Sequence, residues 1–549
     1  MQEIKKAVQA AAKKLYNSEI EPELNRPAKQ FGDYATNAAL QLAKKAAKSP
    51  QEIARALAAE LENQPGIKSV KIAGPGFINF FLSDEALAAA ALSAIDLPRS
   101  NHGQEILVEF GDPNPFKDMH IGHLYSYVTG DAISGLLAAS GAKVERLSYH
   151  GDVGPHVAKW LWAVHQQFGW DAEAADQALH EEGKDIGYFY TVGAKAYEED
   201  EQAKAEIEGI NAKVYAHDDA GLDRMYELGK HLSFDEFDKI LNLLSISTDK
   251  RYLESQSSQK GTELVKDNLG KVFQESQGAI IYEGEKKGLH TRVFINSRGL
   301  PTYEAKDLGL AELKAQDYPR AARSIIITAN EQAEYFKVML AALGEIDPAA
   351  ASMTAHLSHG FVSLKSGKMS SREGNVYTAM RLILEIKDAV HKQYPDSPER
   401  KSMTFAALKY AFLKNRLGGD LTFDINESIS LEGNSGPYLQ YAHARACSIL
   451  AKAQASPAGE IKDLDEAERS LARKIGEYPE VVVKAVSELM PHHICTYLYE
   501  LAQTFNGFYE TSRIIDDERQ DLRLQLVKAY QQVLSSGLSI LNIKAPERM

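Results

Sequence analysis

The chain has 549 residues, of which 44% are hydrophobic and 25% charged, and its formal net charge is −14. This length suits roughly three or four domains, and the negative charge argues against a protein that binds nucleic acid by charge alone. Only Cys447 and Cys495 are present, which excludes a disulfide framework and a cysteine zinc cluster. No run is long and apolar enough to span a bilayer, and residues 1–6 lack a signal-peptide pattern, so we expect a cytoplasmic protein without a membrane segment.

The first part of the chain predicts a small α/β domain. Residues 1–62 are rich in alanine, and their apolar positions recur every three or four residues, which is typical of helices. Residues 67–72 and 74–82 instead alternate around a Gly-Pro-Gly turn, as the two strands of a hairpin do. We expect this domain to end near residue 100.

The most informative stretch follows, at residues 106–123. Residues 106–110 are typical of a buried strand, a turn rich in Pro and Asn comes next, and a helix begins near Gly122. A strand, turn and helix N-terminus of this kind is where α/β sheets bind phosphates. His120 and His123 share one side of the first helical turn, and Gly122 leaves room for a flat ring. The alternative interpretation is a pair of surface histidines that cap a helix.

The middle of the chain predicts a doubly wound sheet that an insertion divides. Residues 104–168 have a strand–helix–strand–helix pattern, with the second strand at 144–149, and residues 170–268 are helical and highly charged. The pattern then resumes, with strands expected at 279–282, 291–295, 324–328 and 359–364 and helices at 306–316 and 332–343. Beyond residue 395 almost every segment is amphipathic and helical.

A second motif, Lys368-Met369-Ser370-Ser371-Arg372, lies on a loop between Gly367 and Gly374, which suits a mobile lid. With the His-x-Gly-His turn it resembles the two signatures of class I aminoacyl-tRNA synthetases. Within that class the chain is similar to arginyl-tRNA synthetases at residues 31–34, 74–79, 109–123, 368–375, 436–445 and 545–549. It departs from the family at Gly111-Asp112, where two serines are usual, and at Asp118, where proline is usual.

The resemblance implies an α/β fold of the class I synthetase type, with a Rossmann-like parallel sheet split by a helical insertion. A small α/β N-terminal domain and an all-α anticodon-binding domain would complete it. The expected parts are an N-terminal tRNA-contacting domain (1–100), the first catalytic half (101–170), a mostly helical insertion (171–275), the second catalytic half (276–395) and the anticodon-binding domain (396–549).

The resemblance also implies a reaction. The carboxylate of L-arginine attacks the α-phosphorus of ATP, which carries Mg²⁺, and the arginine then passes to the 3′ end of tRNA(Arg). Such catalysis needs positioning and neutralisation of phosphate charge, and no tightly bound protein metal is expected. The implied catalytic residues are His120, His123, Lys117 and Lys368, with Gly122, Met369 and Ser370 as further ATP contacts.

Arginine binding needs carboxylates that face a guanidinium. By resemblance, Glu109 and Asn114 hold the amino-acid end, and Tyr303 and Asp307, four residues apart on one helical face, contact the guanidinium. Gln332 is the implied further contact. Without the resemblance, a core aromatic and an ordinary acid of a helix N-terminus would be the simpler interpretation of Tyr303 and Asp307.

The resemblance implies tRNA contacts at both ends of the chain. The side chains expected to be exposed on one helix, where aromatic and basic groups suit stacking on anticodon bases, are Tyr438, Gln440, Tyr441, His443 and Arg445. Packing between helices is the alternative interpretation of Tyr438 and Tyr441. Phe77 and Asn79 are expected to meet the outer corner of the tRNA. The resemblance further implies that activation of arginine needs bound tRNA, as in other arginyl-tRNA synthetases. Separately, we expect a monomer, because the sequence contains no heptad seam.

Two other functions remain open at this point. Another nucleotidyltransferase with a His-x-Gly-His turn would be a small single domain, and the helical module argues against it. A non-catalytic tRNA-binding paralogue would tend to lose His120, His123 or Lys368, and all three are present. Pyrophosphate exchange with and without tRNA distinguishes the three functions.

Overall fold

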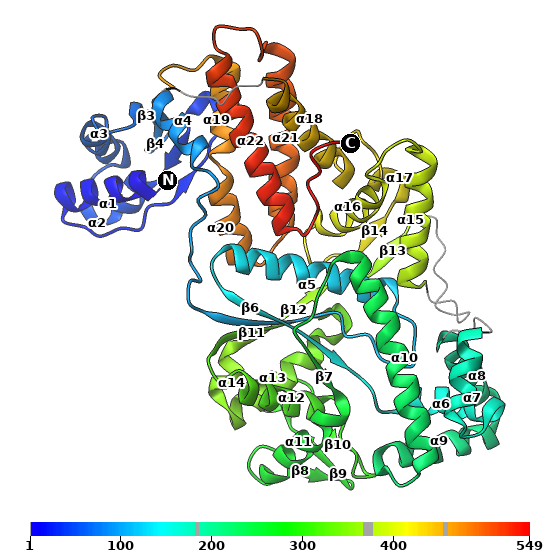
Figure 1. The fold of residues 1–549 in the computed structure, drawn as a ribbon. Helices are drawn as coiled ribbons and strands as arrows, with labels where there is room; N and C mark the ends of the chain where they lie inside the picture. The colour runs from blue at the N-terminus through cyan, green and yellow to red at the C-terminus, as the bar shows by residue number, and fades with distance from the viewer. Residues whose placement is uncertain (1, 182–185, 366–376, 454–458, 460) are drawn as a thin grey trace. The chain divides into compact units, whose positions relative to one another are not determined.

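The structure, a computed structural model, describes residues 2–181, 186–365, 377–453, 459 and 461–549 (Figure 1). The chain forms two compact units. Unit 1 comprises Met1–Leu97, Ala442–Val481 and Tyr497–Ser536, and unit 2 comprises Pro98–Tyr441, Val482–Thr496 and Gly537–Met549. Among the described residues, no helix combines the length and apolar character that crossing a membrane requires.

Unit 1 begins with a four-stranded antiparallel sheet in the order β1-β2-β4-β3. The predicted hairpin is confirmed, because the last two strands pair across a turn where Gly74 and Gly76 have positive φ angles of 54° and 139°. Helices cover one face, and Leu42, Leu57 and Phe80 are fully buried between the layers. The elements are α1 (Gln2–Tyr16), β1 (Leu24–Asn25), β2 (Tyr34–Thr36), α2 (Ala38–Ala46), α3 (Pro50–Leu61), β3 (Ile67–Ala73), β4 (Phe77–Leu82) and α4 (Asp84–Leu92).

The rest of unit 1 is helical. Phe505 stacks on Tyr530 with ring centroids 3.9 Å apart, which packs two long helices together. The helices concerned are α18 (Gly436–Ala453), α19 (Glu466–Ile475), α20 (Tyr478–Glu488), α21 (His492–Thr511) and α22 (Gln520–Ile540). A boundary between the two units falls within each of them except α19.

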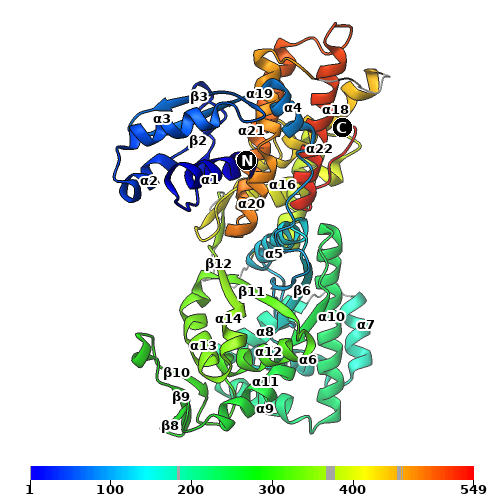
Figure 2. The same ribbon diagram turned by 90° about the vertical axis from the view of Figure 1, so that its left-hand side faces the viewer.

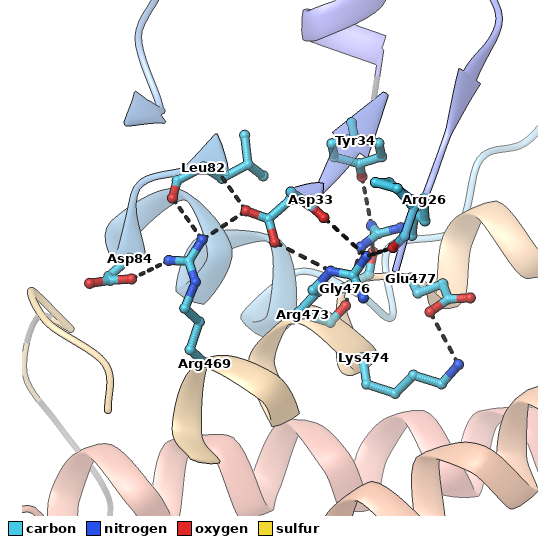
Figure 3. A network of polar contacts seen from close by, with 12 residues as sticks. Arg26, Asp33, Tyr34, Leu82, Asp84, Arg469, Arg473, Lys474, Gly476 and Glu477 are labelled. Atoms are coloured by element: carbon cyan, nitrogen blue, oxygen red, sulfur yellow. Dashed lines mark hydrogen bonds and ion pairs between the residues drawn. The ribbon is translucent and has the colours of Figure 1, made fainter. Parts of the chain in front are cut away.

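A polar network inside unit 1 joins the N-terminal sheet to α19 and α20 (Figure 3). Asp33 is only 3% exposed, and Arg469 Nη2 lies 2.7 Å from its carboxylate. Arg473 lies 3.3 Å from the other oxygen of Asp33, and Arg26 pairs with Glu480 at 2.8 Å. Ion pairs this well buried stabilise a contact only when their geometry satisfies both partners. The network therefore fixes how the N-terminal domain lies on these helices.

Unit 2 is built on a five-stranded parallel sheet in the order β12-β11-β5-β6-β7. In Figures 1 and 2, α5 lies on one face and α12 and α13 lie on the other. This arrangement confirms the predicted α/β class with a parallel sheet. The elements are β5 (Glu105–Glu109), α5 (Ile121–Ala139), β6 (Lys143–His150), β7 (Lys250–Leu253), β11 (Ala321–Ala329), β12 (Thr354–His359), α12 (Tyr303–Asp317) and α13 (Ala333–Ile346).

The prediction was wrong about several strands. β7 lies inside the stretch predicted to be helical, and it is a strand because Leu147 to His150 of β6 pair with it. The strands expected near 279–282 and 291–295 exist but form a separate antiparallel sheet of β8 (Gln274–Ser276), β9 (Ala279–Tyr282) and β10 (Arg292–Ile295). The strand expected at 359–364 is divided between the end of β12 and β13 (Val362–Leu364), which pairs with β14 (Leu421–Phe423).

The helical insertion has its own core, and the turn between β5 and α5 enters it. Phe116 of that turn is fully buried, stacks on Tyr226 at 5.7 Å and meets Trp160 edge-on at 5.3 Å. Its backbone N–H donates to Ser233 Oγ at 2.8 Å. The insertion therefore helps to hold the turn. The helices that build this core are α6 (Pro155–Phe168), which precedes the insertion, and α7 (Ala172–Glu181), α8 (Ile186–Glu199), α9 (Glu201–Ala216) and α10 (Ala220–Leu244).

The C-terminal residues beyond α22 pack within unit 2. Lys409 Nζ donates to the carbonyl of Asn542 at 2.6 Å, and Gln440 Nε2 donates to the carbonyl of Lys544 at 2.8 Å. These residues thus belong to the same compact unit as the parallel sheet. The remaining helices of unit 2 are α11 (Glu254–Asp267), α14 (Pro348–Met353), α15 (Ala379–Gln393), α16 (Arg400–Leu413) and α17 (Ile425–Ser428).

Candidate active site

A pocket of about 720 Å³ opens at the carboxyl ends of β5 and β11. This edge of a parallel sheet is where ligands bind in open α/β folds. The pocket brings together eight of the predicted site residues from separate segments of the chain. They are Glu109, Asn114, His120, Gly122, His123, Tyr303, Asp307 and Gln332.

The two histidines begin α5 and cap it. His120 Nδ1 accepts the backbone N–H of Gly122 at 3.1 Å, and His123 Nδ1 accepts the backbone N–H of His120 at 3.3 Å. The rings stack with centroids 3.6 Å apart. Because both Nδ1 atoms accept hydrogen bonds, each neutral ring carries its proton on Nε2. The capping part of the alternative interpretation was therefore right, but these are not surface histidines, because both line the pocket.

Both imidazoles are neutral at pH 7. Burial, with a smaller effect of Lys117, lowers the pKa of His120 to about 4. Burial and then the neighbouring His120 lower the pKa of His123 well below its ordinary value. Even as neutral rings, the two histidines at this helix N-terminus present Nε2–H donors to phosphate oxygens.

Of the two lysines predicted to be catalytic, the structure describes only Lys117. Lys117 does not line the pocket; its ammonium lies 4.6 Å from the centre of the Tyr190 ring on α8. It is still close enough to lower the pKa values of both histidines. Lys368, Met369 and Ser370 lie outside the described residues.

The other side of the pocket is acidic and amide-rich. Asp307 on α12 accepts a hydrogen bond from the Tyr335 hydroxyl of α13. Burial, and next the charge of Glu109, raise the pKa of Asp307 well above its ordinary value. Asn114 Oδ1 accepts the backbone N–H of Gly151 at 3.2 Å, which leaves its amide N–H groups for a ligand. A buried acid of this kind is suited to a cationic ligand.

The structure adds pocket residues that the sequence did not indicate. Glu254 is paired with Lys306 at 2.5 Å, and Glu304 with Arg292 at 3.0 Å. Glu109 forms a buried ion pair with Lys314, whose side chain is 4% exposed. No sequence signal marks Glu254 or Glu304, because each meets its cation only after folding. Asp112 also lines the pocket, and its departure from the family pattern was the one available signal.

The predicted tRNA contacts divide into exposed and buried residues. Phe77 and Tyr441 are each 40% exposed, while Tyr438 is half-buried. The expectation that Gln440 and His443 are exposed was wrong, because both are buried. Gln440 donates to Ser402 and to the Lys544 carbonyl. Asn79 is also buried, at 6% exposure, because it lies on β4 between two neighbouring strands.

Arg445 is half-buried within unit 1. Its guanidinium donates to Asn506 Oδ1 at 3.1 Å and lies 5.5 Å from the ring centre of the exposed Tyr509. An arginine on an aromatic ring is a common platform for nucleic-acid bases. The acids, cysteines and histidines within the described ranges form no group of three or more that could hold a metal ion.

Comparisons with known proteins cover the whole chain. Residues 2–82 match the family described as "Arginyl tRNA synthetase N terminal domain", residues 86–414 match "tRNA synthetases class I (R), catalytic domain", and residues 439–549 match "DALR anticodon binding domain". The arginine–tRNA ligase of Limosilactobacillus fermentum is 33% identical, over 100% of this chain and 99% of that protein. The corresponding ligase of Limosilactobacillus reuteri is 31% identical over the same shares.

Two solved structures have the same fold. The arginyl-tRNA synthetase of Thermus thermophilus superposes with a TM-score of 0.83 at 26% identity and covers 100% of both chains. That of Plasmodium falciparum also gives a TM-score of 0.83, at 21% identity, over 100% of this chain and 99% of the other.

Proposed function

The chain belongs to the class I arginyl-tRNA synthetases, and from this premise we propose how its pocket divides the work between ATP and arginine. The enzyme is an ATP-dependent arginine–tRNA ligase. One observation carries the assignment of the pocket. Neutral histidine donors begin α5 on one side, and Asp307, an acid without an ion-pair partner among the described residues, faces the same cavity.

ATP, with its Mg²⁺, binds at the start of α5. The Nε2–H groups of His120 and His123 and the positive end of the helix dipole stabilise charge that builds on the phosphates during attack. Lys117 adds positive charge nearby. Lys368, Met369 and Ser370 complete the ATP site on the strength of the family resemblance alone.

Arginine spans the pocket, with its carboxylate towards the phosphate site and its guanidinium towards Asp307. Its carboxylate must meet the α-phosphorus, so its amino-acid end lies beside Asn114 and the β5 carboxyl end, where Glu109 is located. Its guanidinium lies against Asp307, with Tyr303 and Gln332 at the same side. Asp307 binds the positive charge of the guanidinium, because Glu254 and Glu304 are already paired with Lys306 and Arg292.

tRNA(Arg) contacts the exposed Phe77 and Tyr441 and the half-buried Tyr438 and Arg445. Gln440 and Asn79 are omitted from these contacts because they are buried. Activation waits for tRNA, as the resemblance implies. We further propose a monomer in the cytoplasm.

The test is ATP–pyrophosphate exchange by the full-length protein. We expect exchange that depends on arginine and on tRNA(Arg). Exchange without arginine would indicate another nucleotidyltransferase, and tRNA binding without any exchange would indicate a non-catalytic paralogue. Either result would contradict the proposal.

A further inference from the structure

The pocket has more acidic side chains than arginine has positive charges. Arginine brings two cations, a guanidinium and an α-ammonium. The acids that line the pocket are Glu109, Asp112, Glu254, Glu304, Asp307 and Glu331. Which of them bind substrate depends on which already have a cation of the protein beside them, because a neutralised carboxylate attracts a second cation weakly.

Three of the acids already have a cation of the protein beside them. Glu254 pairs with Lys306 and Glu304 with Arg292, at 2.5 and 3.0 Å. Glu109 pairs with Lys314, and both side chains are 4% exposed, so this pair is shielded from water. Glu331 is exposed. Within the described part of the chain, Asp112 and Asp307 are the remaining acids, and no ion pair joins either of them to a cation.

Asp112 lies at the reactive end of the pocket. It belongs to the turn that leads from β5 to His120, whereas Asp307 lies on α12 under the Tyr335 hydroxyl. The arginine carboxylate must approach the phosphate site at the histidines, and the α-ammonium is attached to the next carbon. The α-ammonium is therefore close to the turn that carries Asp112.

The backbone holds the Asp112 side chain in place. Its φ angle is 51°, a left-handed conformation that aspartate and asparagine tolerate better than most residues. Its Oδ1 accepts the backbone N–H of Tyr149 at 2.8 Å, which leaves Oδ2 for a ligand. Burial, and next the charge of Glu109, raise the pKa of Asp112 well above its ordinary value, and the Tyr149 N–H and the more distant Lys314 offset this rise only in part.

We propose that Asp112, rather than Glu109, supplies the negative charge that binds the α-ammonium of arginine. The inference rests on the proposed function of the pocket and deepens it. A serine, which the family usually has at this position, could offer only a neutral hydroxyl. Asp112 binds the α-ammonium, which Glu109 could bind if it were not paired with Lys314.

The test compares two ligands on full-length protein by calorimetry. One is arginine, and the other is 5-guanidinopentanoic acid, which is arginine without its α-amino group. The variant Asp112→Asn keeps the left-handed backbone and the acceptor for Tyr149 but loses the charge. We expect it to bind arginine about 10- to 100-fold more weakly and the des-amino ligand as wild type does. Unchanged binding of the des-amino ligand also shows that the variant is folded.

Asp307→Asn is the matched control, because it makes the same chemical change in the same pocket. It should weaken both ligands by a similar factor, since both contain the guanidinium. If Asp112→Asn weakens both ligands equally, Asp112 does not recognise the ammonium and the inference is wrong. If it changes neither, Glu109 carries the ammonium and the inference is equally wrong. Wild type that binds neither ligand would overturn the proposed function itself, and the inference with it.

Discussion

His120 and His123 serve α5 and the ligand with different ring atoms. Each Nδ1 accepts a backbone N–H of the first turn, and each Nε2–H remains for phosphate. Replacing His123 with Ala removes one preorganised donor, which typically costs roughly 3 kcal/mol, or more than 100-fold in rate. We expect arginine-dependent exchange to fall by that factor while tRNA affinity is kept. Gln, whose amide nitrogen reaches about as far as Nε2, should recover part of the rate; unchanged exchange in folded His123→Ala would contradict the ATP assignment.

The pKa of His120 gives a prediction about acid stability. A histidine has a pKa of about 6.5 in the unfolded chain, and burial lowers that of His120 to about 4. Between these values the unfolded chain binds a proton that the folded chain does not, so stability falls as the pH falls from about 6.5 to 4. Above pH 6.5 this residue adds no pH dependence. Urea unfolding from pH 4.5 to 8 measures how the free energy of unfolding changes with pH. On the acid side this free energy should change less steeply for His120→Gln than for wild type, and identical slopes would contradict the lowered pKa of His120.

At the scale of elements, helix α8 of the insertion holds the ATP turn through Tyr190. The ring of Tyr190 contacts the Lys117 ammonium, so it keeps that charge near the histidines. Tyr190→Leu should raise the KM for ATP several-fold, while the KM for arginine changes little. Tyr190→Phe keeps the aromatic face and should behave as wild type. Equal behaviour of the Leu and Phe variants would show that the ring does not position Lys117.

The N-terminal domain depends on buried charge to stay on α19. Asp33 is 3% exposed and meets both Arg469 and Arg473, so Asp33→Ala removes a buried acid from both arginines, of which Arg469 keeps Asp84. Loss of one partner of a buried pair costs about 3 kcal/mol or more. We expect faster hydrogen exchange across β2 and α19 and a higher KM for tRNA, with arginine binding unchanged.

The same interface offers a control for that variant. Lys29 and Glu466 pair at 3.3 Å, but their side chains are 48% and 90% exposed. Exposed pairs contribute little, so Glu466→Gln should leave hydrogen exchange and the KM for tRNA near wild type. A comparable effect of the two variants would mean that burial of Asp33 is not what fixes the domain.

At the scale of the whole molecule, activation should require tRNA. Such gating requires that tRNA binds the active conformation better than the inactive one. We expect exchange by full-length enzyme to appear with tRNA(Arg) and not with a tRNA for another amino acid. Full exchange without any tRNA would show that tRNA binding and activation are independent.

Truncation of the chain is a poor test of this gating. Deletion after residue 434 would also remove residues 537–549, which belong to the same compact unit as the active site. Lys409, which the truncated chain would keep, donates to the carbonyl of Asn542 in that segment. Loss of exchange in such a truncation would therefore report a damaged catalytic unit.

The sequence by itself determined the features that depend on neighbouring residues. The β3–β4 hairpin, the strand and turn before His120, and the helices after residue 395 follow from local periodicity and turn chemistry. The family signatures identified the reaction and eight residues that line one pocket.

Only the tertiary structure decided what depends on partners far away in the chain. β7 is a strand because β6 pairs with it, and Gln440 is buried because the C-terminal segment covers it. Glu109 meets Lys314 only when β5 and α12 pack together, and that pairing decides which acids keep their charge for arginine. Sequence periodicity records which face of a segment is apolar, whereas the charge state of a pocket depends on contacts between segments, and these exist only in the folded chain.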